Sequence, residues 1–119
     1  MRVIIAGSRG FFDWRLLCKK VGTILKNIPQ EEIVIITGGA NGADKLGKKY
    51  ADLMGYRHEE YLADWTAHNR KAGVIRNREM AEEADALICF WDGESRGSKD
   101  MISVAEKKGL KTRVIMYKN

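Results

Sequence analysis

The sequence has few cysteines, histidines and prolines, the residues that stabilise a fold through disulfides, metal ions or a rigid backbone. It contains two cysteines, two histidines and one proline among 119 residues. Cys18 and Cys89 fall in a predicted helix and a predicted strand with apolar neighbours, so we expect buried thiols and no disulfide. No metal-ligand spacing occurs, and Ser8, Ser95 and Ser98 have no histidine–aspartate partner set. We therefore expect no metal, no cofactor and no serine-hydrolase triad.

Long apolar runs are also missing. No segment approaches the ~20 apolar residues that a membrane-spanning helix needs. The opening "MRVIIAGSRG" has too short an apolar stretch for a signal peptide. We interpret it as the first strand of a cytoplasmic protein that has no contact with a membrane. The length suits one domain over residues 1–119, which buries roughly two-thirds of the surface that its unfolded chain exposes.

The charge balance is basic. There are 21 lysines and arginines against 16 aspartates and glutamates, which gives a formal net charge of +5. Such a balance permits a polyanionic partner, but a lysine-rich solvated surface explains it equally well. The places where the charges gather are therefore more informative than their sum.

Apolar runs alternate with helical patterns along the chain. Most runs are continuous and rich in β-branched residues, which is typical of parallel strands covered on both faces. The run at 57–62 is polar, which favours an edge strand. Asp13 is expected to cap the first helix and Gly55 to end the second. The alternation predicts an α/β fold with helices on both faces of a mainly parallel sheet. The expected strands cover 2–6, 33–37, 57–62, 86–91 and 112–117, and the expected helices cover 14–28, 43–54, 75–84 and 98–108.

Glycine, serine and arginine gather where three of the expected strands end. Parallel strands bring these ends to one edge of the sheet, where open α/β sheets bind ligands. One glycine alone fits a tight turn, whereas several such loops with hydroxyls and arginines favour a phosphate held by backbone N–H groups. Neither "GSRGFF" nor "GGANGADK" matches a standard nucleotide motif. The candidate ligand-binding residues of these loops are Gly7, Ser8, Arg9, Gly38, Gly39, Asn41, Gly42, Asp44, Asp92, Ser95, Arg96, Gly97 and Ser98.

Asp44 has more than one interpretation. It lies in the first turn of an expected helix, where a carboxylate complements the helix dipole. Next to a phosphate it would repel the anion unless it points elsewhere. It would then hold a sugar hydroxyl, or fix the loop by accepting hydrogen bonds from backbone N–H groups. We favour the loop-fixing role.

The stretch "DWTAHNRKAGVIRNREM" is the densest in polar and aromatic groups. Trp65 could stack on a base, and Asn77 could hydrogen-bond a sugar or a phosphate. Arg76 lies early in its expected helix, where the dipole disfavours a cation, so we expect an anion nearby. Arg78 is expected to pair with a glutamate of the same helix. His58 is expected at the surface of the polar strand.

Four motifs, "GSRGFFD", "TGGANGAD", "YLADWTAHNRKAGVIRNREM" and "FWDGESRGSKDMI", together resemble the YspA-type branch of the SLOG superfamily over nearly the whole chain. That superfamily also includes the Lonely Guy phosphoribohydrolases and the DNA-processing protein DprA. The resemblance implies a Rossmann-like three-layer α/β/α fold with about five strands. It implies a pocket for a nucleotide-derived ligand such as ADP-ribose, NAD or a cyclic nucleotide, lined by the loop residues above with Arg76 and Asn77. It also implies a homodimer or higher homo-oligomer, and an association with conflict between phages and bacteria.

Lonely Guy enzymes cleave the N-glycosidic bond of nucleoside monophosphates with an arginine and a glutamate. Arg76 resembles that arginine, but Met101 falls at the place of the glutamate, so Asp100 and Glu94 are the candidate catalytic carboxylates. Three hypotheses follow. The protein senses or sequesters a nucleotide-derived ligand, cleaves one as an N-glycosidase, or binds single-stranded DNA. We favour the first, because the cations gather in pocket loops and no basic-aromatic module is recognised.

Overall fold

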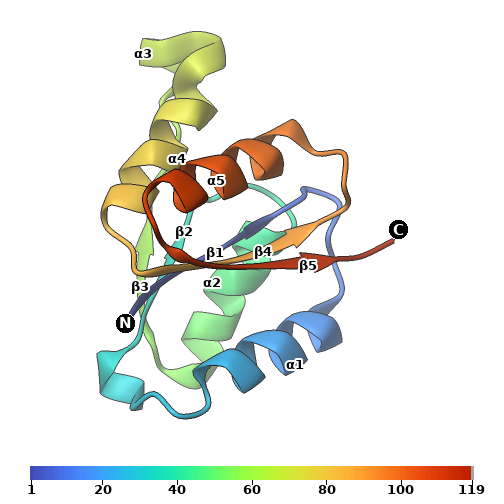
Figure 1. Ribbon diagram of the computed structural model, residues 1–119, viewed down its shortest axis with the longest axis vertical. Coiled ribbons are helices and arrows are strands. Elements are labelled where there is room, and N and C mark those ends of the chain that lie inside the picture. The colour runs from blue at the N-terminus through green and yellow to red at the C-terminus, as the bar shows by residue number, and fades with distance from the viewer. Residues whose placement is uncertain (119) are drawn as a thin grey trace.

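The computed structural model describes residues 1–118, which form five strands in one sheet with helices on both sides (Figure 1). The strands are β1 (Arg2–Gly7), β2 (Val34–Thr37), β3 (Arg57–Glu60), β4 (Ala86–Trp91) and β5 (Lys111–Met116). The α-helices are α1 (Trp14–Leu25), α2 (Ala43–Met54), α3 (Trp65–His68), α4 (Ala72–Glu82) and α5 (Arg96–Lys107). Short 3₁₀ turns precede β2 and α4, at Gln30–Glu32 and Asn69–Lys71.

All neighbouring strands are parallel, in the order β3-β2-β1-β4-β5. Helices α1 and α2 cover one face of the sheet, and α4 and α5 cover the other (Figure 1). The chain adds strands on one side of β1 and then continues on the other side, so the strand order reverses between β1 and β4. Such a reversal is where open α/β sheets bind ligands. The predicted Rossmann-like three-layer α/β/α fold is confirmed.

Alternating side chains on the central strands build two cores, one on each face of the sheet. On β1, Val3 and Ile5 belong to the core under α1 and α2, whereas Ile4 and Ala6 belong to the core under α4 and α5. All four side chains are buried. This explains why residues 3–6 of β1 are all apolar. The edge strand β3 is polar and partly exposed, as its sequence predicts.

Capping residues set the boundaries of α1 and α2 much as predicted. The Leu16 N–H donates to Asp13 Oδ1 at 3.0 Å, which begins α1. That helix ends at Leu25, earlier than expected, because the residue before Pro29 is disfavoured in the helical conformation. Helix α2 ends at Gly55, which takes the left-handed conformation with φ of 73°.

The polar segment after β3 is more ordered than its sequence suggests. It contains α3, which projects beyond the end of α4 (Figure 1). Asp64 begins this helix, because its Oδ1 accepts a hydrogen bond from the Ala67 N–H at 3.0 Å. Helix α4 begins at Ala72, three residues earlier than expected at 75. Helix α5 also begins early, at Arg96, because Ser95 rather than a later residue caps it.

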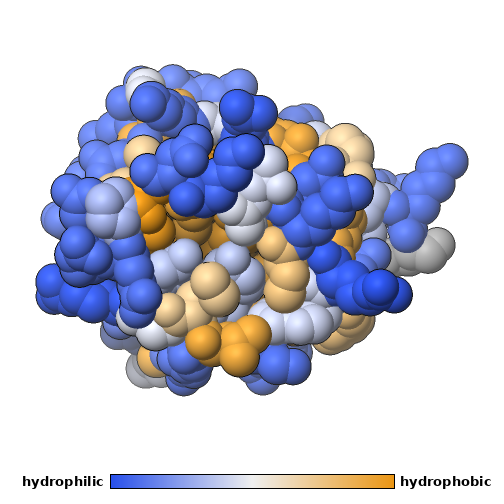
Figure 2. All heavy atoms as spheres, turned by 90° about the horizontal axis from the view of Figure 1, so that it is seen from below, coloured by the Kyte–Doolittle hydropathy of each residue, from blue (hydrophilic) through white to orange (hydrophobic). Residues whose placement is uncertain are grey.

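The surface on one side of the sheet is mostly hydrophilic, and the two cysteines do not form a disulfide. Seen from the side of α1 and α2, hydrophilic residues cover most of the surface, and hydrophobic ones are visible between them (Figure 2). Cys89 is buried as expected, but Cys18 is only partly buried, and both are free thiols. Over residues 1–118, no helix has the length and apolar character to cross a membrane. In the same residues, no three His, Cys, Asp or Glu side chains gather where they could hold a metal ion.

Candidate functional site

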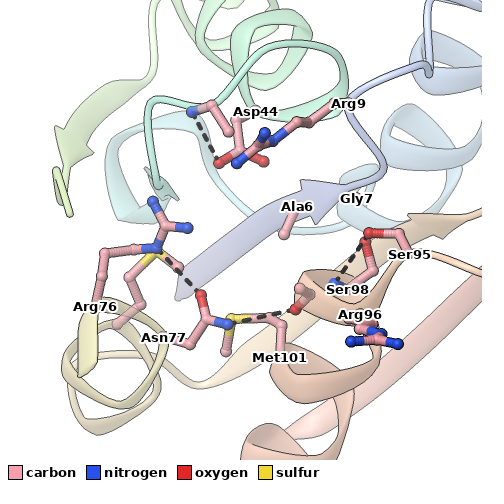
Figure 3. Close-up of a pocket in the computed structure, with 13 residues that line it drawn as sticks. Ala6, Gly7, Arg9, Asp44, Arg76, Asn77, Ser95, Arg96, Ser98 and Met101 are labelled. Carbon is pink, nitrogen blue, oxygen red and sulfur yellow. Dashed lines mark hydrogen bonds between the residues drawn. The ribbon is translucent and has the colours of Figure 1, made fainter. Parts of the chain in front are cut away.

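A cavity of about 330 Å³ lies at the carboxyl end of β1, on the side where β4 and α5 follow (Figure 3). Its walls come from the loops after β1 and β2, from α4, and from the first turns of α5. These segments are far apart in the sequence and meet as predicted at the reversal of strand order. The lining residues are Ala6, Gly7, Arg9, Ala40, Asp44, Arg76, Asn77, Met80, Ser95, Arg96, Gly97, Ser98 and Met101.

A second cavity of about 420 Å³ adjoins the first, because Arg9, Ala40 and Arg76 line both. Two of its side chains are largely open to solvent, Leu62 at 69% exposure and Trp65 at 53%. An apolar and an aromatic surface are therefore available beside the shared arginines. The other lining residues are Gly38, Gly39, Asn41 and Ala63.

The first turn of α5 presents unpaired N–H groups to the first cavity. The N–H groups at the start of a helix have no partner within the helix. Here the Ser95 N–H donates to Asp92 Oδ1 at 2.8 Å, and the Ser98 N–H donates to Ser95 Oγ at 3.4 Å. Within residues 1–118, the N–H groups of Arg96 and Gly97 have no acceptor. With the positive end of the helix dipole, they make a place for an anion.

The guanidinium of Arg76 is held at the boundary of the two cavities. Its Nη1 donates to Gly38 O at 2.6 Å, and its Nε donates to Asn77 Oδ1 at 3.1 Å. A guanidinium has five N–H hydrogens, so three of them have no acceptor within the described chain. Asn77 is itself held, because its Nδ2 donates to Asp100 Oδ2 at 2.9 Å and to Gly97 O at 3.4 Å. Asn77 thus positions Arg76 relative to α5 (Figure 3).

Asp44 fixes the loop after β2, in the role favoured from the sequence. Its Oδ2 accepts hydrogen bonds from the N–H groups of Gly38 at 3.0 Å and Ala40 at 3.3 Å. Those two N–H groups are consequently not free for a phosphate. The Asp44 side chain lines the first cavity but is only 4% exposed. Burial raises its pKa to about 6, although the charge of Arg76 and the two N–H groups act in the opposite direction.

Gly42 and Gly97, at the starts of α2 and α5, have different surroundings. Gly42 has φ of +78°, and a Cβ there would lie 2.4 Å from Ser8 O and 2.5 Å from Arg9 O. Packing between two loops therefore explains Gly42 without any ligand. A Cβ at Gly97 would meet nothing within 4 Å. A ligand can therefore approach the backbone more closely at Gly97, at the start of α5, than at Gly42.

Most of the predicted ligand-binding residues line one of the two cavities, but Gly42, Ser8 and Asp92 do not. Ser8 and Asp92 instead join the loops after β1 and β4 to each other. Ser8 Oγ accepts a hydrogen bond from the Asp92 N–H at 3.2 Å. Asp92 Oδ1 accepts hydrogen bonds from the N–H groups of Ser95 and Glu94, both at 2.8 Å. These bonds, that of Ser95 first, lower the pKa of Asp92.

The two carboxylates expected from the resemblance to a glycosidase lie outside both cavities. Asp100 bonds to Asn77 and lines a groove between α4 and α5. Glu94 is exposed in the loop before α5. Met101 is 1% exposed and forms part of the wall of the first cavity. In residues 1–118, Asp44 is therefore the one carboxylate that lines either cavity.

Two side chains have contacts that differ from those expected. Arg78 forms no salt bridge within residues 1–118 and lines the groove between α4 and α5, so the predicted pairing with a glutamate is wrong. His58 is partly buried, and its Nε2 lies 2.7 Å from Thr37 Oγ1, the last side chain of β2. Burial lowers the pKa of His58.

Sequence reasoning missed the apolar lining of the cavities. Ala6 and Met80 line the first cavity, but their apolar periodicity marks them only as core residues. Leu62 lines the second cavity. Its signal was an apolar side chain at the end of the polar run at 57–62, and this side chain lies beyond the last residue of β3 in the structure.

Comparison with known proteins identifies the family. The model of the YspA, cpYpsA-related SLOG family matches residues 1–68, more than half of the chain. The chain belongs to this family. Another relative of this SLOG protein is the Gene 61 protein of Mycobacterium phage D29, which is 35% identical over 117 residues. That match covers 92% of the chain and 91% of the phage protein. The resemblance inferred from the four motifs is confirmed.

A solved structure shares the fold of this SLOG protein. DNA processing protein A (DprA) from Streptococcus pneumoniae superposes on 95% of the chain with a TM-score of 0.74, at 18% identity. The chain spans about half, 49%, of that DprA chain. A predicted subunit of tRNA methyltransferase from Methanocaldococcus jannaschii matches 98% of the chain and 70% of its own, with a TM-score of 0.47 and 18% identity. The likeness to DprA concerns the fold alone.

Proposed function

We propose that this SLOG protein binds a nucleotide or nucleotide-derived ligand, as a sensor or a sequestering protein. The observation that carries the proposal is a set of unengaged donors around one cavity. The set comprises the N–H groups of Arg96 and Gly97, three N–H hydrogens of Arg76, and the guanidinium of Arg9, which has no acceptor in residues 1–118. A phosphate group, with several charged oxygens, matches such donors well.

The phosphate would lie at the start of α5 rather than in the glycine-rich loop after β2. The N–H groups of Gly38 and Ala40 already donate to Asp44. The Asp44 carboxylate would also repel an anion placed against it. At α5, by contrast, the carboxylate of Asp92 is turned to its own loop and two N–H groups are open to the cavity.

The base of the proposed ligand would lie in the second cavity. The exposed ring of Trp65 and the side chain of Leu62 offer a flat, apolar surface of the kind on which bases stack. Arg9 and Arg76 lie between this surface and the start of α5, since they line both cavities. A ligand with a base at one end and phosphates near its middle, such as ADP-ribose, would span the two cavities.

Binding without cleavage is the activity that the site supports better. The two carboxylates that the resemblance offers to an N-glycosidase, Asp100 and Glu94, reach neither cavity. Asp44 lines the first cavity, but its Oδ2 is already engaged by two N–H groups of its loop. The proposed ligands occur in the cytoplasm, where we place the protein. The relative from a phage agrees with a role in conflict between phages and bacteria. A homo-oligomer stays a prediction from the family resemblance.

Calorimetric titration with AMP, ADP-ribose and NAD tests the proposal. We expect at least one of them to bind, and Arg76→Gln to weaken that binding about 10- to 100-fold, as expected for loss of a charged hydrogen-bond donor. Arg78→Gln is the matched control, because it removes the same charge from the same helix but lines neither cavity. If none of the three ligands binds at millimolar concentration, the proposal fails.

Two further measurements separate the other hypotheses. Mass spectrometry of small molecules released from the heat-denatured protein would identify a co-purified ligand. Release of free adenine from AMP would instead favour an N-glycosidase. Binding of single-stranded DNA that weakens steeply with salt and ignores added nucleotide would favour a nucleic-acid partner.

A further inference from the structure

Half of the Asp44 carboxylate has no partner in the protein. Oδ2 accepts both hydrogen bonds from the loop, and no hydrogen bond within residues 1–118 uses Oδ1. In the described chain, the fully enclosed side-chain oxygens that lack a partner are Ser98 Oγ and Tyr117 Oη. Because Oδ1 is not among them and the side chain lines the first cavity, this oxygen is in contact with the cavity. Figure 3 shows Asp44 among the residues that line the cavity, with one oxygen bonded to the loop.

Fixing the loop does not require a charge at this position. The amide oxygen of an asparagine could accept the same two hydrogen bonds. A carboxylate here is 4% exposed, and its burial raises the pKa to about 6. The ionised form is therefore disfavoured in the folded protein. The loop-fixing role explains Oδ2 but leaves the charge and Oδ1 unexplained.

The nearby arginine does not use Oδ1 either. Arg76 and Asp44 flank the same backbone position, since a Cβ at Gly38 would lie 2.6 Å from Arg76 Nη1 and 2.8 Å from Asp44 Oδ2. No salt bridge joins them in residues 1–118, and Arg76 Nη1 donates to Gly38 O instead. The cavity thus presents free donors and a free acceptor that do not satisfy each other.

A ligand that fits both must carry an anionic group and, at some distance from it, a neutral hydrogen-bond donor. A second anionic group at Oδ1 would be repelled. In a nucleotide, the sugar hydroxyls and the base amino group are such donors. The base would occupy the second cavity, beside Trp65 and Leu62, which leaves the sugar for the first cavity with Asp44.

We infer that Asp44 Oδ1 accepts a hydrogen bond from a ribose hydroxyl of the ligand, and that Asp44 thereby favours ribonucleotides over analogues that lack that hydroxyl. The inference rests on the proposed function, and it goes further by assigning a ligand class to one residue. It also gives a reason for a buried carboxylate, because an ionised acceptor forms a stronger hydrogen bond than an amide.

The selectivity then depends on the charge of Asp44. The charged or titratable groups that face it are Arg76 on α4, Glu60 on β3, Arg9 after β1 and Cys89 on β4. Burial is the main influence on its pKa, and the charge of Arg76 opposes it. Above about pH 6 Asp44 is ionised and accepts most strongly. The preference for ribonucleotides therefore rises as the pH passes from 5 to 8.

The test is the ratio of affinities of the unaltered protein for AMP, 2′-deoxy-AMP and 3′-deoxy-AMP, at pH 5 and pH 8. We expect loss of the recognised hydroxyl to weaken binding about 10- to 100-fold at pH 8, and less at pH 5. The phosphate titrates alike in all three probes, so its effect cancels in the ratio. Equal affinities at pH 8 overturn the inference while the proposed function stands, because AMP still binds.

Inosine 5′-monophosphate distinguishes the sugar from the base, because it lacks the amino group of adenine. If it binds much more weakly than AMP while both deoxy probes bind like AMP, Asp44 recognises the base and the inference is wrong. If AMP does not bind at millimolar concentration, the inference also fails. The proposed function is then decided separately, by ADP-ribose and NAD.

Two matched variants test whether the preference for ribonucleotides depends on Asp44. Asp44→Asn keeps an acceptor for the loop, and we expect it to reduce the ribonucleotide preference and remove its rise with pH. Asp92→Asn makes the same change in an aspartate that also fixes a loop but lines neither cavity. We expect it to leave the ratio unchanged. A ratio that changes equally in both variants contradicts the assignment to Asp44.

Discussion

The loops that follow β2 and β4 are fixed by the same kind of hydrogen bonds, but the aspartate that accepts them is buried in one loop and partly exposed in the other. In each, one aspartate accepts hydrogen bonds from two N–H groups of its own loop. Asp44 is 4% exposed, and burial raises its pKa to about 6. Asp92 is only partly buried, and the same kind of hydrogen bonds lowers its pKa. The loop after β2 is thus closed and packed, whereas the loop after β4 is open.

The comparison separates the hydrogen bonds that fix a loop from the charge that a ligand would contact. Two hydrogen bonds from the backbone suffice to fix either loop, whatever the surroundings of the carboxylate. The direction of the pKa shift then depends on burial. At Asp92 the charge favours folding, and at Asp44 it opposes folding. A charge that opposes folding while lining a cavity points to a role in binding.

The largest expected effect concerns the packing of the two loops. Gly42→Ala places a Cβ 2.4 Å from Ser8 O at a φ of +78°, so it should destabilise the protein by about 3 kcal/mol or more. Gly97→Ala meets nothing within 4 Å and lies in the first turn of α5. It should leave stability unchanged or raise it by up to about 1 kcal/mol. Urea unfolding measures both, and similar losses in the two variants would contradict the contrast between the loops.

The second effect concerns the charge of Asp44. Its pKa rises from 3.8 to about 6 on folding, so the folded chain keeps this proton to higher pH than the unfolded chain. Stability should therefore fall as the pH rises from about 4 to about 6, and stay level above that. Asp44→Asn removes this dependence and should be more stable than the unaltered protein at pH 8, by up to roughly 3 kcal/mol. Urea unfolding at pH 4 and pH 8 tests it. A variant that is less stable at pH 8 would show that the amide does not replace the carboxylate in the loop.

The third effect concerns Asn77, which joins the two regions. It is 4% exposed and bonds to Arg76 on one side and to Gly97 O and Asp100 on the other. Asn77→Ala removes these hydrogen bonds and should destabilise the protein by about 1–3 kcal/mol. Ligand affinity should fall as well, because Arg76 is no longer positioned. Calorimetric titration and thermal unfolding of the same sample measure the two consequences. Unchanged affinity would show that Gly38 O alone positions Arg76.

The smallest effect concerns Asp92. Its pKa is lowered on folding, so its contribution to stability is present at neutral pH and lost as the pH falls through its folded-state pKa. Asp92→Asn keeps an acceptor for both N–H groups and loses only the charge. We expect a slight loss of stability at pH 7 and a smaller one at pH 3, opposite in sign to the change at Asp44. Paired urea titrations at the two pH values measure it.

The fold could be predicted from the sequence because its signals are local. The continuous apolar run of β2, the capping of α1 by Asp13 and the end of α2 at Gly55 each act within a few residues. The convergence of the loops followed from parallel topology. The role of Asp44 in its loop could also be anticipated, because the N–H groups that it binds lie four and six positions before it in the chain.

The details of the site depend on contacts between distant segments, which no local pattern contains. Arg76 bonds to Gly38 O, 38 positions earlier in the chain, and Asn77 bonds to Asp100, 23 positions later. Asp100 is bonded to Asn77 and lines neither cavity. The sequence also could not tell that Gly42 is needed for packing, since a glycine that avoids a neighbouring backbone and one that approaches a ligand look alike.

The bridge through Arg76 and Asn77 has a kinetic and an entropic consequence. It links the loop after β2 to the start of α5 through groups of the protein alone. The walls of the first cavity are therefore in place before binding, and few side chains have to be ordered when a ligand arrives. Association should need no slow rearrangement, so differences in affinity among related ligands should reside mainly in how fast each one leaves.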